Sequence, residues 1–182
     1  MEIVDVARWG VAGLYAILLA IAAVTDVKER RIPNWTVLAL IGLFVPWIFV
    51  GPDVDILSAL AAFAIALAAG VALWAFKIMG AGDSKMFAAV ALFAGLKLLA
   101  YFALGTVLIG GVFALAALAM DPRRALLVWS TKGKVGGRGI PYGAPIAIAG
   151  LIIMFATPFG AIHDTSVSGQ TGGALLQTLP SR

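Results

Sequence analysis

Apolar residues occur along this chain in long blocks that short polar stretches separate. Three blocks stand out first, at residues 9–24, 35–50 and 56–79. Each approaches the roughly 20 residues that an α-helix needs to cross a hydrocarbon core of about 30 Å. Because such blocks repeat along most of the chain, the pattern predicts an all-α bundle of transmembrane helices rather than a soluble domain with one anchor.

The next apolar block, residues 86–120, is too long for a single span. A straight helix of about 35 residues would extend roughly 52 Å and overshoot the membrane. We predict a turn at Gly95-Leu96-Lys97. This turn would separate a short fourth helix, beginning near Gly82, from a fifth span over residues 98–120.

A last apolar block, residues 141–155, predicts a sixth span. The six spans together form one predicted membrane domain, residues 1–156. The remaining residues, 157–182, are rich in Ser, Thr and Gly, and this composition predicts a polar and flexible tail. The N-terminal block has no small-residue cleavage site after it, which predicts a retained span rather than a signal peptide.

Composition supports a membrane protein and removes several enzyme classes. The chain is 62% hydrophobic and 12% charged, far from the balance of a soluble domain. It has no cysteine and one histidine, so thiolate nucleophiles, disulfides and histidine metal clusters are excluded. We therefore expect no metal and no cofactor. The net charge of +4 does not indicate nucleic acid, because the basic residues fall in the loops between apolar blocks.

The distribution of basic residues orients the predicted spans. They cluster after the first span, at the junction of the third and fourth, and after the fifth: Lys28, Arg30, Arg31, Lys77, Lys85, Arg123, Arg124, Lys132, Lys134 and Arg138. The loop at residues 51–55 contains none, and the next turn on that face contains only Lys97. By the positive-inside rule the basic loops are cytoplasmic, and both termini lie outside.

Two aspartates occupy equivalent depths in this topology. Asp26 follows the first span, and Asp83 starts the fourth helix at the same predicted face. Ionisable groups at membrane depth are costly and mark functional sites. Asp83 also follows Gly80 and Gly82, which lack side chains and accept φ values that other residues avoid. A simpler interpretation is that these glycines only break the chain between two helices.

Three motifs together resemble the type IV prepilin peptidases. The first is Asp26 followed by Ile32-Pro33-Asn34, where Pro33 disfavours helix before it and Asn34 can cap the second span. The second is G-x-G-D-x-K, from Gly80 to Lys85, and the third is P-Y-G-x-P, from Pro141 to Pro145. The resemblance implies a six-span G-x-G-D aspartic protease with catalytic Asp26 and Asp83, and an active-site loop set of Gly80, Gly82, Lys85, Pro33 and Asn34.

The resemblance also implies a substrate and a location. The substrate would be a prepilin-like protein with a short basic leader before an apolar helix, cleaved at the cytoplasmic face of the inner membrane. Longer family members carry a paired-cysteine region and methylate the new N-terminus. This chain has no cysteine, so we expect no methylation. The short form is similar to the peptidases of tight-adherence (Flp-type) pili and also to archaeal preflagellin peptidases.

Peptide hydrolysis by two carboxylates requires one ionised group to accept a proton from water and one neutral group to protonate the carbonyl oxygen. An alternative from another class is a small transporter in which the same aspartates bind a cation or relay protons. A third is an inactive structural subunit of a pilus machine. For Lys85, we expect its ammonium group to reach the membrane interface rather than take part in catalysis.

Overall fold

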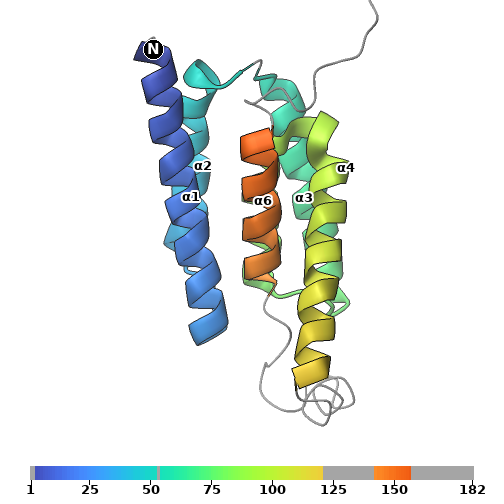
Figure 1. Ribbon diagram of the computed structural model, residues 1–182. Helices are drawn as coiled ribbons and strands as arrows, with labels where there is room; N and C mark the ends of the chain where they lie inside the picture. Colours follow the sequence, from blue (N-terminus) through green and yellow to red (C-terminus); the bar gives the residue numbers. More distant parts are fainter. Residues whose placement is uncertain (1–2, 53, 121–141, 157–182) are drawn as a thin grey trace, which may run out of the picture.

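The computed structural model describes residues 3–52, 54–120 and 142–156. These residues form five helical elements, labelled as in Figure 1: α1 (Ile3–Glu29), α2 (Asn34–Val50), α3 (Ile56–Ala75), α4 (Ala81–Met120) and α6 (Gly143–Ala156). The described part of the chain contains no strand, so the predicted all-α class is confirmed. Three of these helices, α1, α3 and α4, are long and apolar enough to cross a membrane, while α2 and α6 are apolar but shorter.

A sharp break at Gly95 divides α4 into two arms. Gly95 has φ 60° and ψ 178°, a combination open almost only to glycine. The rings of Phe87 and Phe102 stack with centroids 4.7 Å apart, whereas 15 residues of straight helix would separate them by about 22 Å. The second arm therefore folds back along the first. The turn predicted at Gly95-Leu96-Lys97 is confirmed.

The first arm of α4 packs antiparallel to α3. The backbone N–H of Leu96, just after the break, donates to Ser58 Oγ near the start of α3, at 2.9 Å. At the other end of the pair, Ser84 Oγ donates to the carbonyl of Gly70, also at 2.9 Å. The buried positions of α3 are all small, namely Ala59, Ala62, Ala66 and Gly70. Small residues let two backbones approach closely, as membrane helices do when they associate.

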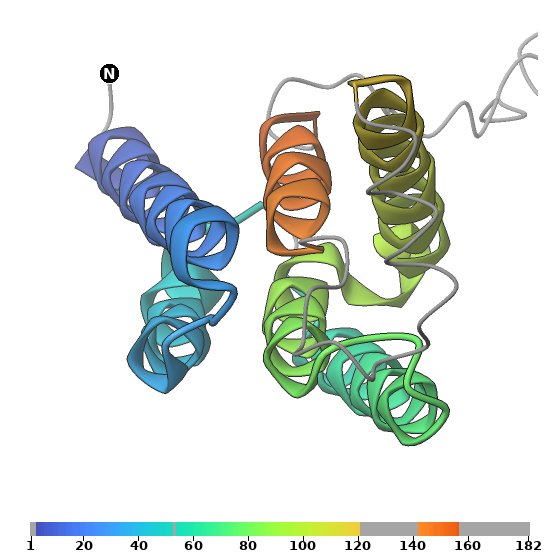
Figure 2. The same cartoon turned by 90° about the horizontal axis from the view of Figure 1, so that it is seen from below.

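Helix α6 lies between α1 and the two arms of α4 (Figure 2). Its Gly150 marks a close approach, because a Cβ there would meet Val90 of α4 at 2.8 Å and the Tyr15 hydroxyl of α1 at 2.9 Å. Helix α6 begins at the end of the bundle where α1 ends and α4 starts (Figure 1). We call this end, which contains Glu29, Ala81 and Gly143, the site end.

Two helix ends differ from the predicted spans. Helix α3 ends at Ala75 rather than at Met79, because Lys77 adopts a left-handed φ of 59°. The N–H groups of Lys77 and Ile78 then bond back to the carbonyls of Trp74 and Leu73, which closes the helix with a Schellman motif. Helix α1 extends beyond its apolar block to Glu29, since no helix breaker stands before Arg30.

Candidate active site

Asp26 lies in the last turn of α1. Arg30 takes a left-handed φ of 56°, and its N–H donates to the Asp26 carbonyl at 2.9 Å, which ends the helix. The positive charge of Arg30 also acts on the Asp26 carboxylate. Asp26 itself is only 5% exposed. A carboxylate buried to that degree needs a hydrogen-bond donor within the protein.

The first residue of α6 supplies that donor. The backbone N–H of Gly143 donates to Asp26 Oδ2 at 2.8 Å, across 117 residues of sequence. The first N–H groups of a helix have no partner inside the helix and carry a partial positive charge. Asp26 therefore acts toward α6 as a capping residue that comes from another helix.

Asp83 occupies the first turn of α4 and is partly buried. Its carboxylate lies over Gly80, where a Cβ would come within 2.8 Å of Oδ2. The negative charge of Asp26 acts on Asp83, so the two carboxylates are within electrostatic reach of one another. The two aspartates that the sequence predicts as a pair thus both lie at the site end (Figure 1).

Ser84 fixes the start of α4 against α3. The side chain is buried, and its hydroxyl donates to the carbonyls of Gly70 and Gly80 at 2.9 and 3.0 Å. A Cβ on Gly70 would lie 2.9 Å from the Ser84 Cβ. Because Ser84 follows Asp83 directly, this contact determines where the Asp83 backbone is placed.

The two predicted loop motifs meet beside this pair. Lys85 Nζ donates to Asn34 Oδ1 at 3.5 Å, and the Cβ position of Gly82 lies 3.4 Å from Ile32, an ordinary packing distance. The predicted capping role of Asn34 is wrong. Pro33 occupies the N-cap of α2 without a side-chain cap, and its carbonyl accepts from the N–H and hydroxyl of Thr36.

The reason given for Gly80 and Gly82 also needs correction. Among the described glycines only Gly95 has a positive φ, so neither motif glycine is needed for an unusual backbone conformation. A Cβ at Gly80 would lie 2.8 Å from Asp83 Oδ2, so a side chain there would require the Asp83 carboxylate to move. In this motif the Asp83 carboxylate therefore lies against the backbone of Gly80, where no side chain is present.

Comparison with known families agrees with this geometry. The model of the type IV leader peptidase family matches residues 13–115, which is more than half of the chain and includes both aspartates. The chain belongs to the type IV leader peptidase family. Membership indicates a protease with a prepilin substrate, and the apolar helices indicate a multi-pass membrane protein. Searches of curated proteins and of solved structures returned no match.

Sequence reasoning missed three residues at the site of this leader peptidase family member. Gly143 stands inside the P-Y-G-x-P segment, which was the available signal, although the segment does not say which group it contacts. Gly70 and Ser84 gave no separate signal, because one lies in an alanine-rich helix and the other between two more informative residues. Their roles depend on contacts between helices.

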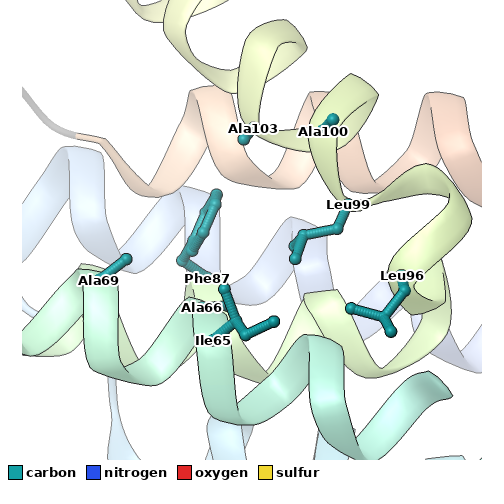
Figure 3. A pocket seen from close by; sticks show the side chains of 8 residues that line it. All are labelled: Ile65, Ala66, Ala69, Phe87, Leu96, Leu99, Ala100 and Ala103. Carbon is teal, nitrogen blue, oxygen red and sulfur yellow. The ribbon is translucent and has the colours of Figure 1, made fainter.

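A cavity away from the aspartates is lined only by apolar side chains. An apolar pocket of about 330 Å³ lies between α3 and the two arms of α4, lined by Ile65, Ala66, Ala69, Phe87, Leu96, Leu99, Ala100 and Ala103 (Figure 3). None of these side chains can exchange a proton. Within the described ranges, no three His, Cys, Asp or Glu side chains gather as a metal site would require. The candidate site is therefore the aspartate pair.

Proposed function

We propose that this protein is an aspartic endopeptidase that removes the leader peptide of type IV, Flp-type prepilins, using Asp26 and Asp83, without methylating the product. The observation that carries the proposal is the placement of Asp26, at the end of α1, and Asp83, at the start of α4, at the same end of the bundle (Figure 1) and within electrostatic reach of one another. Membership of a leader peptidase family supports the same reaction.

The chemistry requires two carboxylates in different protonation states. One, ionised, removes a proton from water while that water attacks the scissile carbonyl, and the other, neutral, donates a proton to the carbonyl oxygen. Two carboxylates close together favour this division, because both cannot easily be charged at once. The half-buried position of Asp83 at a helix start gives water access that the middle of a bilayer would deny.

The charge distribution supports a six-span protein with a cytoplasmic active site. Here α1, α2, α3, both arms of α4 and α6 each count as one span. The described basic residues at the site end are Lys28, Arg30, Arg31, Lys77 and Lys85. At the opposite end stand Lys97 and Arg8, and Arg8 pairs with Asp5 at 3.6 Å. This asymmetry favours a cytoplasmic site end and external termini.

The location of the pair supports the proposed substrate. A carboxylate pair at the membrane boundary suits a peptide bond between a polar leader and an apolar helix, because that bond lies at the same depth. We therefore propose a prepilin whose basic leader remains at the cytoplasmic face. An archaeal-type preflagellin is the alternative substrate for the assay.

The test is cleavage by the purified protein in detergent or liposomes. An Flp-type prepilin and a preflagellin serve as substrates, and Asp26→Asn and Asp83→Asn are compared with wild type. Each substitution should lower the cleavage rate by a factor of about 10² to 10⁴, as expected for loss of an acid or base. Asp55→Asn is the matched control, because Asp55 caps α3 at the opposite end and Asn can keep that cap. Wild-type rates in either site variant would refute the proposal.

A further inference from the structure

We propose that Gly143 is a positioning residue for the reaction. Its N–H holds one oxygen of Asp26, and its missing side chain makes room for the aspartate. This inference rests on the proposed function, since it assigns a role to Asp26 in catalysis. It adds a third helix, α6, to a site otherwise built from α1 and α4.

The hydrogen bond joins two buried groups. Gly143 N–H and Asp26 Oδ2 are 2.8 Å apart, and both residues are buried. As the first residue of α6, Gly143 has an N–H that no carbonyl of its own helix can accept. The bond to Asp26 is therefore made without loss of a helical one. With Oδ2 held, rotation of the carboxylate is restricted, which fixes the direction in which Oδ1 points.

The space around this bond excludes every side chain. A Cβ on Gly143 would lie 2.7 Å from Asp26 Oδ2, 2.8 Å from its Cβ and 3.0 Å from its Cγ. A carboxylate oxygen could rotate away, but the Asp26 Cβ is fixed to the backbone of α1. Even alanine at position 143 would therefore push α1 and α6 apart or move the whole aspartate.

The packing of α6 shows how the bond between Gly143 and Asp26 affects the position of Asp26 relative to α4. Helix α6 packs against both α1 and α4. Helix α1 meets α4 through the rings of Tyr15 and Phe93, whose centroids are 4.6 Å apart. This contact lies about three helical turns from Asp26. At the site end, the bond from the start of α6 thus acts together with the contacts of Ile32 and Asn34 to set Asp26 relative to the start of α4.

An ester substitution tests the hydrogen bond without adding atoms. Glycolic acid, incorporated at position 143 by nonsense suppression, replaces the N–H of Gly143 by an oxygen. We expect kcat for prepilin cleavage to fall by about 10- to 100-fold, from the value of a hydrogen bond to a charged group, with KM unchanged. The control is glycolic acid at position 150, which removes a hydrogen bond inside α6. It should lower thermal stability and leave kcat near wild type.

Two alanine substitutions test whether the space beside Asp26 must stay free of a side chain. Gly143→Ala and Gly150→Ala place a methyl group at nearly the same distance from a neighbour, 2.7 and 2.8 Å, on the same helix. Both should lower thermal stability, but only Gly143→Ala should lower kcat strongly. Equal losses of kcat in the two variants would show general packing and overturn the positioning role.

The outcomes separate this inference from the proposed function. If Asp26→Asn abolishes cleavage while the ester at position 143 leaves kcat unchanged, the positioning role is refuted and the catalytic pair stands. If Asp26→Asn itself retains full activity, the proposed function fails, whatever the ester does. Loss of kcat in the ester at position 143, with wild-type KM and with kcat near wild type in the ester at position 150, supports the inference.

Discussion

The contact between Gly70 and Ser84 predicts that the start of α4 cannot tolerate a methyl group on α3. In Gly70→Ala the new Cβ would lie 2.9 Å from the Ser84 Cβ and 3.2 Å from its Cα. Because one of these atoms belongs to the backbone, rotation of a side chain cannot relieve the contact. Overpacking of this kind costs about 1–3 kcal/mol.

Helix propensity acts in the opposite direction. Alanine is better than glycine within a helix by about 1 kcal/mol, which partly offsets the clash. Gly42→Ala in α2 is the matched control, because nothing lies within 4 Å of its Cβ position and it has the same gain in propensity. The difference between the two variants isolates the clash. We expect Gly70→Ala to be less stable than Gly42→Ala by about 2 kcal/mol.

The assay is unfolding by dodecyl sulfate in mixed micelles, followed by tryptophan fluorescence, together with the prepilin cleavage rate. Because Ser84 follows Asp83 in the chain, Gly70→Ala should also slow cleavage more than Gly42→Ala. Equal unfolding midpoints for the two variants would refute the close packing of α3 against α4.

Two further predictions concern the backbone. Gly95→Ala should destabilise the protein by about 2–3 kcal/mol, because φ 60° and ψ 178° suit glycine almost alone. Gly111→Ala is the control in the same helix, because a Cβ there meets nothing within 4 Å. Equal unfolding midpoints for the two variants would contradict the break in α4. Lys77→Gly should stabilise the protein by about 1 kcal/mol, because a residue with a Cβ is strained in the left-handed conformation. Equal unfolding midpoints for Lys77→Gly and Lys77→Ala would contradict the left-handed conformation at position 77.

Local signals in the sequence predicted several elements correctly. The length limit of a bilayer required a turn inside residues 86–120, and Gly95 was the residue able to make it. Pro33 correctly placed the start of α2, because the residue before a proline is disfavoured in a helix. The chain order of apolar blocks alone placed Asp26 and Asp83 at the same end.

Other features depended on contacts that no local pattern contains. The bond between Gly143 and Asp26 spans 117 residues, and nothing near Asp26 indicates which helix start it meets. Asn34 is a good capping residue by type, yet Pro33 takes the cap position and Asn34 contacts Lys85 instead. Residue type correctly indicated a helix start here, but the partner of each side chain depended on how the helices pack.

The central claim is that Asp26 and Asp83 act as one catalytic pair, and a double-variant cycle tests it most directly. Cleavage of a prepilin is measured for Asp26→Asn, Asp83→Asn and the double variant, all shown to be folded. Groups that act as a unit lose nearly everything with the first substitution. We predict that the double variant has the same residual rate as either single variant, within about threefold. Losses that multiply in the double variant would contradict the pair.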